Sequence, residues 1–325
     1  MERPIIVVGS INLDLVVGSD RIPQVGETII GSTFNTFYGG KGANQAVAVA
    51  KLGYPVSMVG NVGSDAFGAQ LRKGLEAVAL DTTYVNTVEG PSGVALITTG
   101  VSGENSIVVV PGANNQLTPA MLEKARPILD LAGFILAQLE IPLETVEYLS
   151  QFAVAHDIPL MLDPAPARKL SDNLLRSVSW ITPNETEAQQ LLNSNIDFAD
   201  GGIHAAADLL LHSGAKNVLL KLGSAGCVIA QGTMPMQAVP AFSIDAVDTT
   251  GAGDAFNAGF SVGLMRGYTV EESAVFASAV AAISVTRPGA QASMPDRSEV
   301  DLFLLQHSKP LPCVLYPAKN LDPRR

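Results

Sequence analysis

The stretch DTTGAGDAFNAGF, residues 248–260, joins a glycine-containing loop to an expected helix. Small and apolar residues recur at helical spacing after the loop, namely Ala255, Ala258, Gly259 and Val262. Asp254 is therefore expected in the first helical turn. Two interpretations of its carboxylate are open: it stabilises the helix dipole, an effect of about 0.3–1 kcal/mol, or it accepts a proton from a substrate.

Three residues with short side chains precede this carboxylate, Gly251, Ala252 and Gly253. Backbone amides at the N-terminus of a helix form an anion site when no side chain covers them. Helix-dipole stabilisation does not explain the glycines, because a helix start needs one capping residue and not a bare loop. Amides that hold charge on a moving phosphoryl group, beside a carboxylate that receives a hydroxyl proton, indicate phosphoryl transfer.

The composition favours one large globular domain with an appendage. The chain has 325 residues, of which 47% are hydrophobic and only 16% are charged, so a large core is expected. The formal net charge of −11 disfavours binding to nucleic acid and to anionic membranes. A phosphate ligand held locally by backbone amides remains compatible with that charge.

The cysteines and the apolar segments indicate a soluble cytosolic protein. Two cysteines, Cys227 and Cys313, are too few for a disulfide framework, and Cys227 lies in an apolar run typical of a core. The N-terminus enters a strand-like run within five residues, which leaves no room for a signal peptide. The longest apolar stretch, 273–285, is too short and too rich in serine to span a bilayer.

Short apolar runs alternate with amphipathic stretches along the chain. We expect strands at 5–8, 56–60, 134–138, 159–163, 180–184, 218–223 and 227–231. We expect helices at 43–52, 65–78, 118–127, 143–155, 185–193, 203–213, 252–266 and 271–285. This alternation predicts an α/β fold with a mainly parallel central sheet and helices on both of its faces.

Two segments, 13–40 and 93–111, break this rhythm because they alternate in polarity and carry turn residues. We predict that they form antiparallel strands of a small flap outside the main sheet, with a hairpin turn at 102–105. One domain is expected to cover residues 1–307. The tail, 308–325, is rich in proline and has no periodicity, so we expect it to be disordered or to drape over the surface.

Polar residues follow several of the expected strands, at the sheet edge where α/β proteins bind ligands. These residues are Asn12, Asp14, Glu140, Asn184 and Glu187. Asn12 and Asp14 are two apart, so they share one face of an extended chain. Simpler interpretations stay open, because Asp14 and Glu140 could be surface charges and Asn184 could be a helix N-cap.

The segment YGGKGANQAVAVAKLG, residues 38–53, carries a second glycine cluster. Its glycines let the backbone approach a ligand closely, and Lys41 and Asn44 offer donors near the start of a helix. A flexible turn with a solvated lysine is the simpler interpretation. The segment is not a Walker A loop, since no serine or threonine follows the lysine, and GxGxxG is also missing. ATP would therefore need a different binding device.

The chain resembles the ribokinase-type carbohydrate kinase family, which also holds fructokinases and adenosine kinase. The segments 39–53 and 248–260 are similar to its N-terminal and C-terminal signatures, and 11–14, 184–187, 222–226 and 285–293 add to the resemblance, which covers about residues 3–306. The resemblance implies a Rossmann-like α/β domain with a small β-sheet lid, and the lid would double as the interface of a homodimer.

The resemblance also implies a set of site residues. Asp254 would deprotonate the 5-hydroxyl of the sugar, and Gly251 to Gly253 would form the anion hole. The sugar would be bound by Asn12, Asp14, Gly40, Lys41, Gly42, Ala43, Asn44, Glu140 and Asp254. ATP would be bound by Asn184, Lys221, Leu222, Gly223, Ser224, Ala225, Gly226, Gly253 and Ser278. Glu187 would organise Mg²⁺ through water, and K⁺ would be bound by oxygens of Asp248, Thr250, Ser284, Arg287, Gly289 and Ser293.

The chain departs from the family pattern at three nucleotide positions. Lys221 and Ala225 stand where a threonine and a basic residue are typical, and Ser278 stands where a histidine or asparagine often meets adenine. We therefore expect altered nucleotide affinity and unchanged chemistry.

The expected activity is ATP-dependent phosphorylation of D-ribose at the 5-hydroxyl. Alternative substrates are 2-deoxyribose, fructose and adenosine. An alternative of another class is a non-catalytic, sugar-responsive binding protein, but the intact Asp254 argues against it because a pure binder needs no base.

Overall fold

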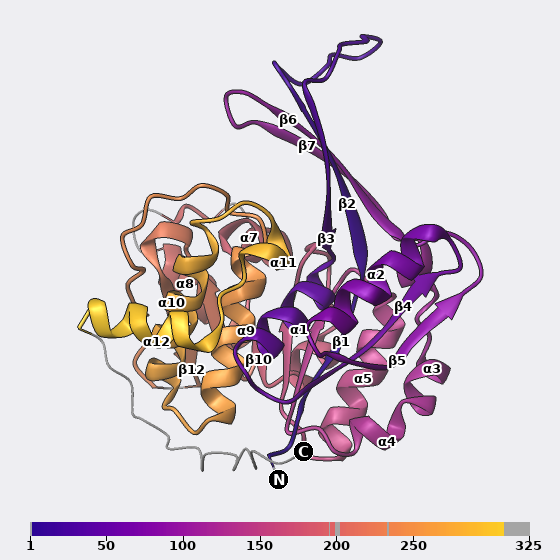
Figure 1. Cartoon of the computed structure of the whole chain (residues 1–325). Helices are drawn as coiled ribbons and strands as arrows, with labels where there is room; N and C mark the ends of the chain where they lie inside the picture. The colour runs from indigo at the N-terminus through magenta and orange to yellow at the C-terminus, as the bar shows by residue number, and fades with distance from the viewer. Residues whose placement is uncertain (1, 195, 199–201, 233, 309–325) are drawn as a thin grey trace, which may run out of the picture.

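The computed structural model describes residues 2–194, 196–198, 202–232 and 234–308. Within these residues the central sheet has nine strands in the order β13-β12-β11-β10-β9-β8-β1-β4-β5 (Figure 1). The strands are β1 (Ile5–Val8), β4 (Val56–Gly63), β5 (Asp81–Val88), β8 (Phe134–Gln138), β9 (Leu160–Asp163), β10 (Trp180–Ile181), β11 (Asn217–Lys221), β12 (Cys227–Gln231) and β13 (Gln237–Val239). All neighbours pair in parallel except β11 with β12 and β12 with β13. The predicted fold class, a mainly parallel sheet, is confirmed.

Each face of this sheet carries its own hydrophobic core. In β1, Ile5 and Val7 belong to one core while Ile6 and Val8 belong to the other, which explains why the strand is apolar throughout. The first core takes residues from α1 (Lys41–Lys51), α2 (Ala66–Ala77), α9 (Ala252–Met265), α10 (Val270–Ser284) and α12 (Arg297–Gln306). The second takes them from α3 (Pro119–Lys124), α4 (Arg126–Leu129), α5 (Leu143–Ala155), α6 (Asp172–Ser177), α7 (Glu185–Leu192) and α8 (Ile203–His212).

Some elements differ from the sequence prediction. The single helix expected at 118–127 is divided into α3 and α4, and Pro127 lies at the start of α4. Proline has no amide hydrogen, so it cannot continue the hydrogen-bond ladder of α3. The helices α6 and α12 and the strands β5 and β13 were not predicted. The predicted tail lies outside the described residues from 309 onward.

A separate four-stranded sheet rises from the body as a lid (Figure 1). Its order is β3-β2-β6-β7, with β2 (Asn12–Ser19), β3 (Thr33–Gly39), β6 (Gly93–Gly100) and β7 (Asn105–Val110). The pairs β2–β3 and β6–β7 are antiparallel, as predicted, but β2 and β6 are parallel. The prediction of a wholly antiparallel flap is therefore wrong at its centre. The reason is that β2 follows β1 and β6 follows β5, so both leave the same edge of a parallel sheet.

No helix within the described part of the chain is long and apolar enough to cross a membrane.

Candidate active site

The first turn of α9 holds Asp254, as predicted, and buries it to 4% exposure. Gly251 is the N-cap of α9, and its φ of 76° lies in the left-handed region that favours glycine. Two neighbouring residues of α1 hold the carboxylate: Asn44 Nδ2 donates to Asp254 Oδ2 at 2.9 Å, and Gln45 Nε2 donates to Asp254 Oδ1 at 3.1 Å. The carboxylate is thus fixed in orientation before any ligand binds.

The environment of Asp254 suits a general base. Burial raises the pKa of Asp254 to about 6, the charge of Lys41 lowers it, and the charge of Asp163 raises it. A carboxylate with this pKa is ionised at neutral pH and is still more basic than an exposed one. Burial alone would lower the pKa of Lys41, but the charges of Asp254, Asp163 and Glu140 outweigh it, so the pKa of Lys41 is raised and its ammonium stays charged.

The glycine pair before Lys41 lets α1 begin against the end of β1. Gly40 has a φ of 87°, and a Cβ atom there would lie 2.7 Å from the backbone nitrogen of Asn12. Glu140 completes this junction, because its Oε2 accepts from Lys41 N at 3.1 Å and from Ser10 Oγ at 2.5 Å. The structure therefore brings the N-terminal signature, the end of β1 and Glu140 together, which makes a solvated turn the wrong interpretation of this segment.

Three carboxylates, Asp14, Glu140 and Asp254, share the space between α1 and the base of the lid. The pKa of Asp14 is raised to about 7, mainly by burial and further by the charges of Glu140 and Asp254. Neither Asp14, exposed to 9%, nor Asn12, exposed to 3%, is a surface residue. Asn44 Oδ1 is buried and has no hydrogen-bond partner within the described residues, so it can accept from a ligand hydroxyl.

A cavity of about 400 Å³ opens beside Asp14, between the lid and the loop before α9. Asp14, Phe37 and Thr99 line it from the lid, and Asp248, Thr250 and Gly289 line it from the body. Its mixture of carboxylates, hydroxyls and an aromatic ring suits a small polyhydroxylated ligand.

A second cavity of about 270 Å³ lies on the other side of the α9 N-terminus. Its apolar walls include Phe242, Ile244 and Phe256, which suit an aromatic base. From the predicted nucleotide set, it is lined by Lys221, Gly223, Ser224, Gly226, Gly253 and Ser278. Leu222 is buried in the second core and Ala225 lies exposed in the loop, so neither lines the cavity.

Asn184 and Glu187 form a reciprocal capping box at the start of α7. Glu187 N donates to Asn184 Oδ1 at 2.8 Å, and Asn184 N donates to Glu187 Oε2 at 2.8 Å. The interpretation of Asn184 as a helix cap is confirmed. The charge of Glu187 also contributes to the raised pKa of Lys41. Across the described ranges, no three His, Cys, Asp or Glu side chains gather as a metal site.

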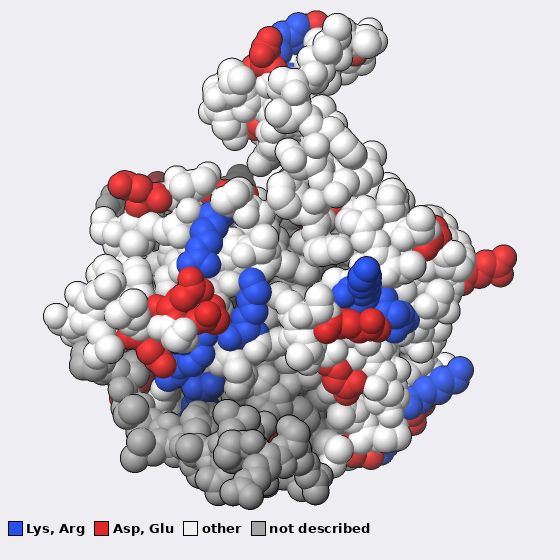
Figure 2. Space-filling model, viewed as in Figure 1, with Lys and Arg blue, Asp and Glu red and all other residues white. Residues whose placement is uncertain are grey.

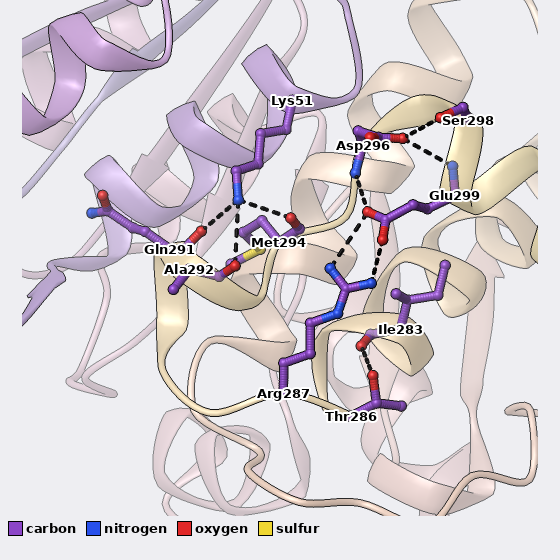
Figure 3. A network of polar contacts seen from close by, with 10 residues as sticks. All are labelled: Lys51, Ile283, Thr286, Arg287, Gln291, Ala292, Met294, Asp296, Ser298 and Glu299. Atoms are coloured by element: carbon purple, nitrogen blue, oxygen red, sulfur yellow. Dashed lines mark hydrogen bonds and ion pairs between the residues drawn. The ribbon is translucent and has the colours of Figure 1, made fainter.

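Asp248 joins the two loops to which the family resemblance assigns K⁺. Its Oδ1 accepts from Thr250 N at 2.9 Å and its Oδ2 accepts from Gly289 N at 2.8 Å. Ser284 Oγ and Ser293 Oγ each donate to a backbone carbonyl at 2.8 Å, which leaves their oxygen lone pairs free. One carboxylate with hydroxyl and carbonyl oxygens is a donor set that fits a monovalent cation. The guanidinium of Arg287 points to Glu299, so only the backbone oxygen of Arg287 suits this set (Figure 3).

Lys51, at the C-terminal end of α1, contacts the segment that follows Gly289 (Figure 3). Its Nζ donates to the carbonyls of Gln291 and Met294 at 2.9 Å each, at the end of α11 (Ala290–Ser293). One helix thus contacts the base through Asn44 and the candidate cation loop through Lys51.

Sequence reasoning missed three residues that hold the site together: Gln45, Asn114 and Asp163. Gln45 Nε2, besides its bond to the base, donates to Asp163 Oδ2 at 3.3 Å. Asn114 Nδ2 donates to Asn12 Oδ1 at 2.6 Å. Asp163 ends β9 at the ligand-binding edge of the sheet, and that position was a signal that could have identified it.

Comparison with known proteins gives one consistent result. The family model described as pfkB family carbohydrate kinase matches residues 3–297. Ribokinase of Bacillus subtilis is 42% identical over 303 residues, which cover 93% of this chain and 99% of the relative. Deoxyribokinase of Salmonella typhi is 38% identical over 302 residues, covering 92% and 98%. The structure of Arabidopsis thaliana ribokinase complexed with ribose and ATP has a TM-score of 0.87 at 36% identity, covering 94% of this chain and 99% of that chain.

Proposed function

Because the chain belongs to the pfkB family of carbohydrate kinases and is therefore a sugar kinase, we propose that it transfers the γ-phosphoryl group of ATP to the 5-hydroxyl of D-ribose. The observation that carries this proposal is the position of Asp254. Its carboxylate is buried, is held by Asn44 and Gln45, and lies at the helix end that separates two cavities of different polarity.

Each part of the site has a separate task in this reaction. Asp254 accepts the proton of the sugar hydroxyl as that oxygen attacks phosphorus. The amides of Gly251, Ala252 and Gly253 hold the charge that develops on the phosphoryl oxygens. The Ala252 amide donates to the carbonyl of Thr249 at 3.2 Å in this structure and would exchange that bond for the phosphoryl group. Lys41 keeps Asp254 ionised from the sugar side. The buried setting excludes water, which would otherwise compete with the sugar for the phosphoryl group.

The sugar lies, in this proposal, in the cavity beside the lid. Asn12, Asp14, Asn44 and Glu140 hold its hydroxyl groups, while Gly40, Lys41, Gly42 and Ala43 form the backbone against which it rests. 2-Deoxyribose is the second candidate substrate, because the deoxyribokinase of Salmonella typhi is 38% identical to this chain.

The nucleotide lies in the apolar cavity, with its phosphates directed at the start of α9. We propose Mg²⁺ as a cofactor, with Glu187 facing it through water; the ion would neutralise the phosphate oxygens. We also propose K⁺ between the loops joined by Asp248, where it would add positive charge beside the anion hole without touching substrate.

The lid supports the proposal of a homodimer. Every residue of β7 is exposed, and Ile107, Val108, Val109 and Val110 are apolar. Apart from its tip, the lid shows almost no charged side chains in the view of Figure 2. An apolar edge strand of this kind pairs readily with a second copy. A cytoplasmic location also belongs to the proposal and fits the buried free thiol of Cys227.

ADP formation with ribose, 2-deoxyribose, fructose and adenosine, each with and without K⁺, tests the function. We expect the highest kcat/KM with ribose and a stimulation by K⁺. A protein that binds ribose and forms no ADP with any of the four would instead be a binding protein.

A further inference from the structure

Lys221 places a nearly buried ammonium group at the centre of the site. The residue ends β11, its side chain is 12% exposed, and its Nζ lies 3.0 Å from Asp163 Oδ1. Asp163 is itself only 3% exposed, so this is an ion pair inside the protein. Burying an ion pair costs several kcal/mol of desolvation for each ion. A pair kept at that cost calls for a role other than stabilising the fold.

The ammonium also faces the anion hole. A Cβ atom added to Gly253 would meet Lys221 Nζ at 3.5 Å, nearer than any other atom outside the helix and the adjacent residues. The N-terminus of a helix carries partial positive charge and favours anions, not cations. A lysine aimed at such a terminus is repelled by it unless a negative group comes between them. Lys221 and Gly253 both line the apolar cavity, so a ligand can reach the space between them.

We propose that Lys221 binds the terminal phosphates of ATP directly and that Asp163 holds its ammonium in position for them. This role rests on the proposed function, and it changes the expectation drawn from the sequence. There, Lys221 belonged to the ATP-binding set that the resemblance implies, but as an unusual residue at its position it put nucleotide affinity in doubt. Its geometry instead adds a charged contact to the phosphoryl group that the amides of Gly251 to Gly253 receive.

Lys221 complements Lys41 and does not duplicate it. Lys41 starts α1 on the sugar side, where its backbone contacts Glu140. Lys221 comes from β11 on the nucleotide side. The negative charge of Asp163 acts on both lysines, through a direct bond to Lys221 and through space on Lys41. The transferred group would therefore pass between two ammonium groups that are anchored on different elements.

The test compares Lys221→Met, Lys221→Arg and the wild-type chain, with Lys216→Met as a matched control on an exposed lysine five residues earlier. Removal of one donor to a developing oxyanion costs about 10²–10³-fold in rate. We expect Lys221→Met to lower kcat/KM for ATP by that factor, and Lys221→Arg to recover most of the loss. The KM for ribose should stay within about threefold in all variants.

Calorimetric binding of ATP and AMP separates a phosphate contact from general damage. Lys221→Met should weaken ATP binding by about tenfold or more, as expected for a charge-assisted contact, and leave AMP binding unchanged. An equal loss for both nucleotides, or kcat/KM for ATP within about threefold of wild type, would overturn the proposal. Binding is measured without turnover, so it tests the role of Lys221 even if no sugar is phosphorylated. The absence of phosphorylation would refute the proposed function and leave the role of Lys221 to be decided by the binding data.

A double-mutant cycle tests the positioning role of Asp163. If Asp163 acts through Lys221, Asp163→Asn should weaken ATP binding in the wild-type background and have little further effect in Lys221→Met. Additive losses would show that Asp163 acts on its own and would reject its positioning role.

Discussion

The two cavities that meet at the start of α9 differ in chemistry. The cavity beside the lid is lined by the carboxylates of Asp14 and Asp248, the amide of Asn105 and several threonine hydroxyls, and the charge of Glu140 acts on Asp14. The other has walls of Phe242, Ile244 and Phe256 and a single ammonium group. Carboxylates are suited to neutral hydroxyl groups and repel phosphates, while the amides and the ammonium attract phosphates. This difference supports our proposal that the sugar binds on one side and ATP on the other. Ala246 and Thr249 line both cavities, and Asp254 lies buried in the first turn of α9.

The largest effect is expected from Asp254→Asn, which removes the proposed base at the start of α9. Loss of a positioned base lowers turnover by about 10²–10⁴-fold, whereas the amide keeps the size of the side chain. We expect kcat to fall by at least about 10² while calorimetry still detects ribose binding. Unchanged turnover would show that the base lies elsewhere.

Asp14→Asn is expected to weaken binding of the sugar and to leave binding of ATP unchanged. We expect the KM for ribose to rise by about 10–100-fold and the KM for ATP to stay unchanged, because hydrogen bonds to the sugar are weakened in ground and transition states alike. Kinetics with each substrate varied in turn would measure this. A change confined to ATP would mean that the two cavities are assigned the wrong way round.

The same substitution should stabilise the ligand-free protein at pH 8. The folded-state pKa of Asp14 is raised from 3.8 to about 7. While Asp14 is protonated, below pH 4, it does not lower the free energy of unfolding. As the pH rises through 7 the buried carboxyl group ionises, and the free energy of unfolding falls. Asn carries no charge, so we expect the free energy of unfolding to rise by about 2–4 kcal/mol at pH 8 and to change little at pH 4. Urea denaturation at both pH values gives the comparison.

The pH dependence of turnover sharpens the assignment of the base. The pKa of Asp254 is raised to about 6, and the base acts only when it is deprotonated, so kcat/KM should rise with pH up to about 6 and then level off. Lys41 lowers this pKa, so Lys41→Met should move the acidic limb to higher pH. If the acidic limb of the kcat/KM profile did not move, Lys41 would not act on the pKa of the base.

The smallest effect is expected from Lys51→Met, at the C-terminal end of α1. The lost hydrogen bonds to the carbonyls of Gln291 and Met294 are partly exposed, so we expect about 1–2 kcal/mol less stability. If the loop they hold carries K⁺, the concentration of K⁺ that gives half-maximal activity should also rise. A variant with wild-type stability would show that these bonds contribute nothing measurable.

The sequence predicted the elements whose signals are local. The apolar runs 5–8 and 227–231 coincide with β1 and β12, because strands covered on both faces are apolar throughout. β5 was missed because its residues DTTYVNTV are half-exposed and largely polar. The parallel pairing of β2 with β6 could not be predicted, since polarity alternation identifies a strand and not its partner.

The site residues show the same contrast between local sequence signals and contacts formed across the chain. Asp254 and Asn44 were found because each lies in a glycine-containing motif. Gln45 and Asp163 were missed because their roles come from contacts across the chain, 209 residues from Gln45 to Asp254 and 118 from Gln45 to Asp163. Such contacts exist only after the sheet has assembled.

The parallel junction of the lid has a mechanical consequence. β2 and β6 leave the body side by side, with Asn12 opposite Gly93 and Asp14 opposite Ala95. A tilt of this double stem would therefore displace Asp14 together with the whole upper sheet. Binding of a sugar hydroxyl by Asp14 and closure of the lid would then be one movement. A second subunit paired through the outer end of the lid would be displaced by that movement as well.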